Sequence, residues 1–519
     1  MSRARPFDVL PTQLVRRASP SARLRVALVN APPLGLQEPQ YDTPDFTRYS
    51  LAVLAGFLRA NGVASEDILL IDAKFERIGY REIRRRLEGF RPDLVGHTAF
   101  TNEIVQCGRV AAIAHAVGRA QGRRVVNIVG GVHATALPEQ TLREFPQFDL
   151  ACFGDGEETL LQLYRHLARG DGLDDLSAID GLAWRAPAQP GVTRKNAERA
   201  RTRDQARIPL PAWDLLPRSP TVLVMTARGC PFACNFCQNP NGKVVRKRDV
   251  EHFLEEVRWL VTERGCVDLH ICDEIFTLDR SRTHAILDGM IALGFGTRFT
   301  FFAQTHINTV DEELLRKIVR AGCRLLGFGM ETGDPDVLRE MGKGTNLRKI
   351  KEVVALTRKA RVRLGTYFIL GQPDEGWASA WNTIKLAIEC NPETPVFGVM
   401  VPYPGTQVWD WAQRGERGYR IASLDWNDYN KQIGDALQFE GISRRGIEFL
   451  QLTGYSLVFL ANGRLREFGG FVWRYRTEGI VLLNKLVAGR LRPPGGAGAY
   501  EADFDEALAL DRAIAPAAP

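Results

Sequence analysis

The stretch Cys230-Pro-Phe-Ala-Cys234-Asn-Phe-Cys237 decides how this 519-residue chain is interpreted. Thiolates ligate iron–sulfur clusters, and this spacing lets one loop contact several irons. A cubane with only three protein ligands keeps one iron open to an outside ligand, as catalytic metal sites require. The sequence therefore predicts a [4Fe–4S] cluster held by Cys230, Cys234 and Cys237.

Structural zinc is the alternative metal, and it needs a fourth Cys or His ligand. The nearest downstream histidine, His252, falls on an expected helix, and the sequence has no second CxxC pair. Clustered thiols without a disulfide framework indicate a reducing compartment. The remaining cysteines stand singly in apolar or strand-like segments and are expected to be buried small side chains: Cys107, Cys152, Cys266, Cys272, Cys323 and Cys390.

Strands and helices alternate from the cysteine loop onward, which predicts a parallel α/β architecture. Residues 220–415 are expected to form a partial (β/α)6 barrel, with its chemistry at the carboxyl ends of the strands. The cysteines follow the first of these strands directly. The expected strands are 221–226, 267–272, 298–304, 324–330, 363–370 and 394–401, with helices such as 250–264 and 311–321 between them.

A second alternation precedes the cysteines and predicts a doubly wound parallel sheet in residues 24–168. Its strands are expected at 25–30, 67–72, 93–96, 124–130 and 148–153. Such sheets bind ligands beyond the carboxyl ends of their strands. The glycines at two of these ends either admit a ligand close to the backbone or form ordinary turns. No G-x-G-x-x-G follows the first strand, which disfavours a Rossmann nucleotide site. The expected binding edge comprises residues 30–35, 96–102, 130–134 and 154–157.

The remaining segments, residues 169–219 and 416–519, are expected to connect the two α/β units and to extend the barrel at its C-terminal side. Residues 169–219 are rich in Pro and Gly and are expected to be a linker. Residues 416–490 are expected to form a mainly helical C-terminal cap, with an apolar part at 447–461 and a basic aromatic part at 464–476. The plain interpretation of this cap is a set of helices packed on the mouth of the barrel. The alternatives are a wall of the substrate pocket, or a face that meets a lipid surface or a carrier-bound substrate. Residues 491–519 are expected to be a disordered tail.

Composition narrows the class of protein further. A hydrophobic fraction of 45% and a charged fraction of 25% are those of a globular protein. The net charge of +7 is spread along the chain, which favours a solvated surface over a nucleic-acid groove. The basic N-terminal residues 1–25 lack an apolar core, so they are not read as a signal peptide. No run approaches the roughly 18 apolar residues of a membrane span, so a cytoplasmic protein is expected.

Residues 221–415 resemble the radical S-adenosylmethionine superfamily, which carries Cys-x3-Cys-x2-Cys with an aromatic residue before the last cysteine. The resemblance implies that the open iron chelates the amino and carboxylate groups of S-adenosylmethionine. One electron then yields methionine and a 5′-deoxyadenosyl radical, chemistry that belongs to the cofactors. The segments 273–274, 329–332, 367–373 and 402–406 resemble the family's strand ends. The implied contacts to S-adenosylmethionine are Phe236, Asp273, Glu274, Gln304, Glu331 and Gly371.

Residues 24–165 resemble the cobalamin-binding domain of the class B radical enzymes, which carry similar G-G-x-H-A/P-T and G-E/D-G-E-x-T segments. Many cobalamin domains supply a lower cobalt ligand from D-x-H-x-x-G. This chain has Asp72-Ala-Lys74 at the comparable place, without the histidine, which leaves His133 and His97 as alternative ligands. The implied contacts to cobalamin are Asn30, Thr98, Gly130, Gly131, His133, Gly154, Gly156 and Glu157.

Together the resemblances imply an enzyme: a radical S-adenosylmethionine, cobalamin-dependent methyltransferase. It would act on an unactivated carbon of a small molecule and receive electrons from a flavodoxin or ferredoxin. Oxidative cyclisation or rearrangement on the same scaffold is the enzymatic alternative, and a non-catalytic cobalamin or redox sensor is the alternative of another class. Methylthio transfer is disfavoured, because it needs a second cluster and Cys107 and Cys152 are too few to hold one.

Overall fold

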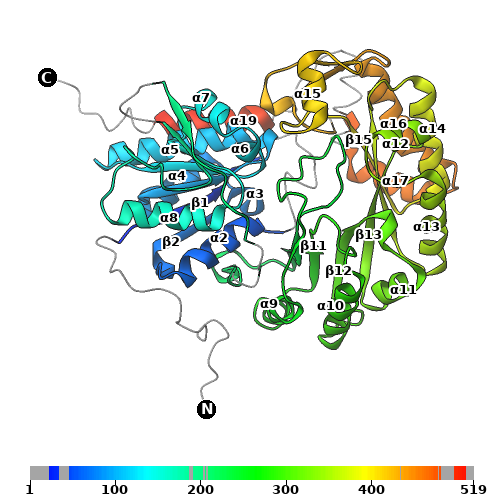
Figure 1. Ribbon diagram of the computed structural model, residues 1–519, viewed down its shortest axis with the longest axis horizontal. Helices are drawn as coiled ribbons and strands as arrows, with labels where there is room; N and C mark the ends of the chain where they lie inside the picture. The colour runs from blue at the N-terminus through cyan, green and yellow to red at the C-terminus, as the bar shows by residue number, and fades with distance from the viewer. Residues whose placement is uncertain are drawn as a thin grey trace.

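The computed structural model describes residues 23–33, 46–185, 191–202, 205, 208–432, 434–476, 479–480 and 496–509. Within these ranges, two α/β units lie side by side, the N-terminal unit in blue and cyan and the second in green and yellow (Figure 1). The expected succession of an N-terminal doubly wound sheet and a partial barrel is confirmed. Residues 1–22 of the basic N-terminal stretch and residues 34–35 of the expected binding edge lie outside the described residues.

The first sheet has the strand order β2-β1-β3-β4-β5-β6-β7, and its first five strands are parallel. Their side chains are buried on both faces, which explains the nearly continuous apolar runs. Helices α2 (Tyr49–Ala60) and α8 (Gly156–Ala168) cover one face, and α4 (Tyr80–Phe90) and α5 (Ile104–Ala120) cover the other. The parallel strands are β1 (Val26–Asn30), β2 (Ile68–Asp72), β3 (Leu94–Thr98), β4 (Val126–Gly130) and β5 (Leu150–Cys152).

Two further strands extend this sheet and correct the expected linker. β6 (Leu182–Arg185) pairs antiparallel with β5, and β7 (Thr193–Lys195) pairs antiparallel with β6. Trp184 is fully buried in the core of the first unit, so part of residues 169–219 belongs to that unit. Of the Pro- and Gly-rich stretches that suggested a linker, residues 170–172 precede β6 and residues 208–217 follow β7, whereas residues 186–190 lie outside the described part of the chain.

The second sheet is entirely parallel, in the order β15-β14-β13-β12-β11-β8. All six expected strands are present in the expected sequence order. Five helices cover its outer face: α9 (Val250–Glu263), α10 (Arg280–Ala292), α11 (Glu312–Arg320), α13 (Leu347–Lys359) and α14 (Trp377–Cys390). The strands are β8 (Thr221–Val224), β11 (Asp268–Ile271), β12 (Thr300–Thr305), β13 (Cys323–Glu331), β14 (Leu364–Leu370) and β15 (Thr394–Val399).

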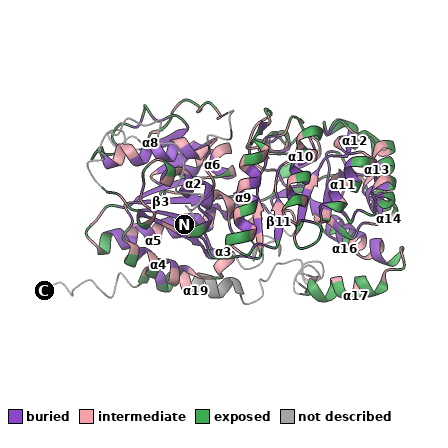
Figure 2. Cartoon of the chain, turned by 90° about the horizontal axis from the view of Figure 1, so that it is seen from below, coloured by how far each residue is buried: buried purple, intermediate pink, exposed green. Residues whose placement is uncertain are grey.

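The C-terminal cap is mainly helical, as expected. α16 (Arg444–Leu460) packs against α14 and β15, where Gln451 donates to the Phe397 carbonyl at 2.7 Å. α17 (Leu465–Arg474) packs on α16 through aromatic rings and is largely exposed on its other side (Figure 2). A small antiparallel pair, β16 (Tyr419–Ile421) with β17 (Leu437–Phe439), precedes these helices. Among the described residues, no helix is both long and apolar enough to cross a bilayer.

The expected disordered tail contains a helix, α19 (Gly496–Ala509), which corrects that prediction. It docks on α4, where Arg81 donates to Asp503 at 2.6 Å and Arg84 donates to the Ala507 carbonyl at 2.6 Å. The Ala- and Gly-rich composition favoured disorder, but Phe504, Ala507 and Leu508 pack against the apolar core of the first unit, which stabilises the helix. Residues 510–519 lie outside the described part of the chain.

One glycine at the carboxyl edge of the first sheet gives a stability test. Gly131 has φ +99°, and a Cβ there would lie 2.6 Å from the Ala99 carbonyl oxygen. We expect Gly131→Ala to lower the free energy of unfolding by about 3 kcal/mol, because this backbone region is open essentially only to glycine. Gly122→Ala is the control: Gly122 has φ +64° with open space around it, so about 1 kcal/mol is expected. Equal losses in urea unfolding would contradict the steric argument.

Candidate active site

The three motif cysteines lie in one loop beyond the carboxyl end of β8. This cluster loop, residues 229–245, connects the paired strands β9 (Ala227–Arg228) and β10 (Arg246–Lys247). All three thiols are free, with Cys237 exposed and the other two half-buried. Backbone hydrogen bonds fix the loop: Cys230 N–H donates to the Gly242 carbonyl at 3.0 Å, and Asn235 N–H donates to the Met341 carbonyl at 3.1 Å.

A second set of contacts ties the cluster loop to the segment that follows β13. The ring of Phe232 stacks on His306 at 4.1 Å, and His306 Nε2 lies 3.1 Å from the Lys343 carbonyl oxygen. The Lys343 ammonium is paired with the Glu331 carboxylate, and both side chains are buried. The loop therefore rests on a rigid part of the barrel, as preorganised metal sites do.

The electrostatics of the loop suit a metal cluster. Loss of hydration beside neighbouring groups raises the pKa of all three thiols, that of Cys234 to about 12, while the positive charge of Lys343 acts to lower each of them. Metal binding deprotonates a coordinating thiol outright. Within the described residues, no three Cys, His, Asp or Glu side chains converge on a single ion. A cubane makes no such demand, because each thiolate binds a different iron, so the donor set fits a [4Fe–4S] cluster.

Two of the acidic residues expected to contact S-adenosylmethionine have protein partners. Asp273 is buried and accepts from the Thr226 N–H at 2.6 Å and from the Thr226 hydroxyl. Burial raises its pKa to about 6. Glu274 accepts from the Gly229 N–H at 3.1 Å and from the Asn241 amide at 2.7 Å. Glu274 therefore braces both ends of the cluster loop, and Asp273 fixes the backbone just before β9.

The other residues expected at this site lie at strand ends or beside the cysteines. Glu331 ends β13 with φ +66°, an uncommon conformation for a non-glycine residue. Gln304 donates to the Tyr367 hydroxyl at 3.4 Å, a long contact. Phe236 packs partly buried against the apolar core. Gly371 lies in a turn, and a Cβ there would be 2.4 Å from the Phe439 ring. The side of Gly371 on which a side chain would stand is therefore filled by Phe439.

The residues expected to contact cobalamin gather at the carboxyl edge of the first sheet. Asn30, Thr98 and Gly130 end β1, β3 and β4. Among the described residues, Asn30 Oδ1 and both ring nitrogens of His133 are buried without a hydrogen-bond partner, as is Thr101 Oγ1 nearby. Buried polar atoms are normally satisfied, and orphans call for a ligand or water. The polar chemistry of this edge therefore fits a ligand rich in amides, such as cobalamin.

Lys74 and one ring nitrogen of His97 are hydrogen-bonded to protein groups, whereas His133 makes a ring-packing contact. Lys74, which stands where related domains have a cobalt ligand, is buried and donates to Glu103 at 2.7 Å. His97 Nε2 lies 2.9 Å from Asn127 Oδ1. The His133 ring packs edge-on against Trp426 at 4.7 Å, and burial lowers its pKa to about 3.

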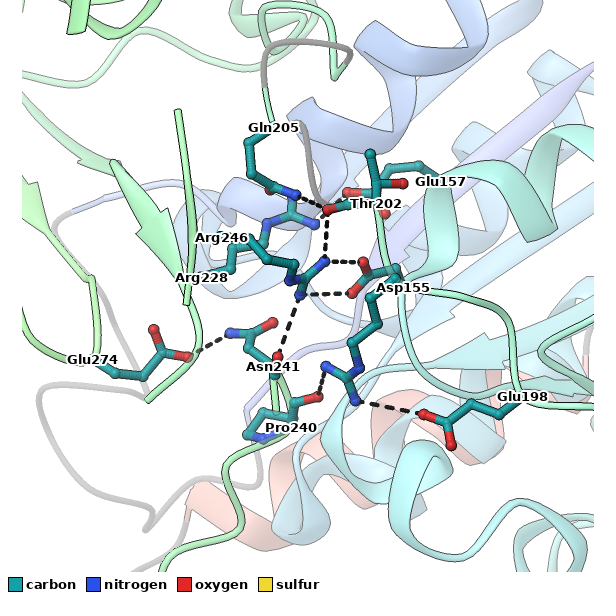
Figure 3. Close-up of polar contacts among 11 residues, drawn as sticks. Asp155, Glu157, Glu198, Thr202, Gln205, Arg228, Pro240, Asn241, Arg246 and Glu274 are labelled. Carbon is teal, nitrogen blue, oxygen red and sulfur yellow. Dashed lines mark hydrogen bonds and ion pairs between the residues drawn. The ribbon is translucent and has the colours of Figure 1, made fainter. Parts of the chain in front are cut away.

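The glycine-rich segment after β5 meets the cluster loop. Gly154 has positive φ with open space around it, and Gly156 begins α8. Glu157 is paired with Arg228 of β9 at 2.7 Å, and Asp155 is paired with Arg246 of β10 through two oxygens (Figure 3). Glu157 was expected to contact cobalamin, but its carboxylate is engaged by the barrel.

Two separate contact regions bring the carboxyl edges of the sheets together. The first is the pairing of the segment after β5 with β9 and β10. The second joins the segment after β4 to residues that follow β15, where His133 packs on Trp426, between β16 and β17, and a Cβ at Gly405 would lie 3.5 Å from Ala136. The Phe46 ring also reaches His270 of β11 at 5.1 Å. The unit expected to bind cobalamin therefore contacts the barrel at its own carboxyl edge, next to the strands that flank the cluster loop.

Sequence reasoning missed Arg228, Arg246, Lys343 and Asn241. Arg228 stands two residues before Cys230, so its position beside the motif was a usable signal. The others carry no periodic or motif signal, because their roles depend on contacts across the fold: Arg246 with the first unit, Lys343 with Glu331 and Asn241 with Glu274.

The fold and the cysteine loop define a radical S-adenosylmethionine enzyme, and comparisons with known proteins agree. The model for the Radical SAM superfamily matches residues 224–387, and that for the B12 binding domain matches residues 42–164. An uncharacterized methyltransferase of Pyrococcus horikoshii is 31% identical over 488 residues, covering 92% of this chain and 99% of the relative. The chain belongs to the radical S-adenosylmethionine enzymes that carry a cobalamin-binding domain.

Further relatives lie at lower identity. The anaerobic magnesium-protoporphyrin IX monomethyl ester cyclase of Rubrivivax gelatinosus is 27% identical over 390 residues, covering 73% of this chain and 68% of the cyclase. The cobalamin-dependent radical enzyme OxsB shares the fold with a TM-score of 0.67 at 15% identity, covering 94% of this chain and 79% of OxsB. The methyltransferase TsrM from Kitasatospora setae has a TM-score of 0.63 at 17% identity, covering 86% of this chain and 89% of TsrM.

The Glu375 carboxyl, at the turn that contains Gly371, leads to a prediction of how the stability of the fold depends on pH. Glu375 accepts from the Gly371 N–H at 2.6 Å, and burial raises its pKa from 4.5 to about 7. The folded carboxyl keeps its proton between these values, whereas the unfolded one loses it. Stability should therefore fall as the pH rises through this window, by at most about 3 kcal/mol. Urea unfolding at pH 5 and pH 7.5 measures it, and an unchanged slope in Glu375→Gln would contradict the assignment.

Spectroscopy can test whether a histidine of the protein binds the cobalt of cobalamin. We expect bound Co(II) cobalamin to have its dimethylbenzimidazole displaced and to show no hyperfine splitting from a protein imidazole. The reason is that Lys74, which stands where related domains have the ligand histidine, is tied to Glu103, so this loop offers cobalt no imidazole. Electron paramagnetic resonance tests this. Nitrogen splitting that vanishes in His133→Ala or His97→Ala would show that a histidine does bind cobalt.

Proposed function

We propose that this enzyme is a cobalamin-dependent methyltransferase that acts on an unactivated carbon of a small molecule. The observation that carries the proposal is the meeting of the two carboxyl edges at the β5–β9 and β4–β15 contacts. Parallel sheets bind ligands at these edges. A substrate in the space between them can meet groups held by either unit.

The residues of the two edges have distinct roles in this proposal. Cys230, Cys234 and Cys237 hold the cluster, and Lys343 offsets the negative charge of their thiolates. When bound, the cluster with S-adenosylmethionine supplies a hydrogen-abstracting radical, and cobalamin supplies a methyl group. The protein's contribution is positioning, because each reactive centre acts only on a carbon held close to it. The unpartnered polar atoms of Asn30, Thr101 and His133 are the candidate contacts to the corrin side chains.

Methyl transfer is favoured over the alternatives by the relatives. The relative that matches nearly the whole chain is named a methyltransferase, although its substrate is not named. Cyclisation stays the second candidate, because the relative from Rubrivivax gelatinosus is named a cyclase. A sensor is disfavoured, since sensing does not require a loop that leaves one iron open. We further propose a cytoplasmic enzyme that takes electrons from a flavodoxin or ferredoxin.

The product ratio tests the proposal. The reconstituted protein, with about four irons per chain, is incubated anaerobically with hydroxocobalamin, a low-potential reductant and S-adenosylmethionine bearing a CD3 methyl group. Candidate small molecules are screened by mass spectrometry for the label. With the acceptor present, S-adenosylhomocysteine and 5′-deoxyadenosine are expected in about equal amounts, because one S-adenosylmethionine supplies the methyl group and a second supplies the radical.

The control is Cys234→Ala, which should form no 5′-deoxyadenosine. Deoxyadenosine without matching S-adenosylhomocysteine would replace methyl transfer by cyclisation or rearrangement. The absence of 5′-deoxyadenosine from the wild-type protein, with a full cluster, would favour the sensor.

A further inference from the structure

We propose that Arg228 and Arg246 are positioning residues that lock the cluster loop to the cobalamin-binding unit through Glu157 and Asp155. The inference rests on the proposed function, because it concerns how the two cofactor edges are held in register. The four side chains form what we term the edge clamp (Figure 3). It assigns to Glu157 and Asp155 a role other than contact with cobalamin.

The edge clamp is buried and geometrically specific. The Arg228 and Glu157 side chains are 13% and 8% exposed, and those of Arg246 and Asp155 are 1% and 11% exposed. Both ends of the Arg246 guanidinium face Asp155, which fixes orientation as well as distance. The same guanidinium also approaches the Thr202 carbonyl at 3.4 Å and the Asn241 carbonyl at 3.3 Å.

The clamp connects to the cysteines through short steps. Arg228 is followed by Gly229, whose N–H donates to Glu274, and Glu274 also accepts from Asn241 at 2.7 Å. Cys230 N–H donates to Gly242, and its carbonyl accepts from Asn239 at 2.9 Å. A shift of β9 or β10 relative to α8 would therefore displace Cys230.

The position of the acidic pair explains why the clamp uses these residues. Asp155 and Glu157 flank the N-terminus of α8, where negative charge is favoured by the helix dipole. That same segment follows β5 at the cobalamin edge. One short segment thus lies at the ligand edge of the first sheet and also grips the strands that flank the cluster loop.

If the edge clamp had a purely structural role, removing it would have the same effect as removing any other contact between the two units. Trp426 provides the comparison: its indole N–H donates to Glu144 at 2.6 Å, which also joins the two units but does not touch the cluster loop. If the clamp is a positioning device, its loss should loosen the cluster loop selectively. If it is only one more contact, its loss and the loss of the Glu144 contact should act alike.

The variants Glu157→Gln and Asp155→Asn remove charge with little change of shape, and Arg246→Lys keeps charge but loses the two-pronged geometry. Glu144→Ala is the control, because it removes the acceptor of the Trp426 indole N–H. Each full-length protein is loaded with iron–sulfur cluster and hydroxocobalamin. Two properties are measured: amide hydrogen exchange of residues 229–242, and the magnetic interaction between Co(II) and the reduced cluster by pulsed electron paramagnetic resonance. Iron content and the melting temperature report on the fold.

We expect the clamp variants to raise exchange in residues 229–242 by about tenfold or more and to broaden the cobalt–cluster distance distribution, while Glu144→Ala matches the wild type in both measurements. Misplacement by about 1 Å can cost 100-fold in rate, so a broadened distribution is the decisive signature. Unchanged loop exchange and distances in the clamp variants would overturn the inference, and so would a uniform rise of exchange across both units. Neither measurement needs a methylated product, so failure of methyl transfer would leave this test intact.

Discussion

The buried ion pairs between α8 and the strands flanking the cluster loop are the interaction on which the arrangement of the site depends. Four charged side chains leave water there, and the cost of desolvation can equal or exceed the attraction between the charges. Such pairs add little net stability. Removing one partner, however, leaves the other charge buried and unpaired, which lowers the free energy of unfolding by about 3–5 kcal/mol. Any other docking of the two units would strand charges in the same way. The ion pairs therefore act mainly by excluding alternative arrangements, and the register of the two edges follows from them.

The polarity of parallel strands explains why so few contacts suffice. Each sheet places all of its ligand-bearing loops at one edge, because every connection returns to the opposite edge through a helix. Two such edges need only a few contacts to be held against each other. The β5–β9 ion pairs form one of these contacts, and the packing of His133 and Ala136 against Trp426 and Gly405 forms another.

The sequence was enough to predict the parts of the fold that repeat. All eleven expected strands lie where apolar runs alternate with helices, and the cysteines follow the first barrel strand as their spacing indicated. It could not predict β6 and β7, because short antiparallel strands between glycines and prolines have no period. α19 was missed because its order depends on Arg81 and Arg84 of a distant helix. The protein partners of the site residues could not be predicted for the same reason: Glu157 matched a family segment, but only the fold reveals that Arg228 engages it.

Glu331 shows how the local and global constraints combine. A glutamate at φ +66° costs energy, and such strain persists only where surrounding contacts over-determine it. Lys343 supplies that constraint by pairing with the carboxylate, and the irregular pairing of β13 with β14 at this point accommodates the backbone. The carbonyl of Lys343 faces His306, which stacks on Phe232 of the cluster loop. One strained residue at a strand end is thus coupled to the loop that carries the cysteines. Because β13 is a central strand of the barrel, the cluster loop takes its position from the sheet on this side and from the edge clamp on the other.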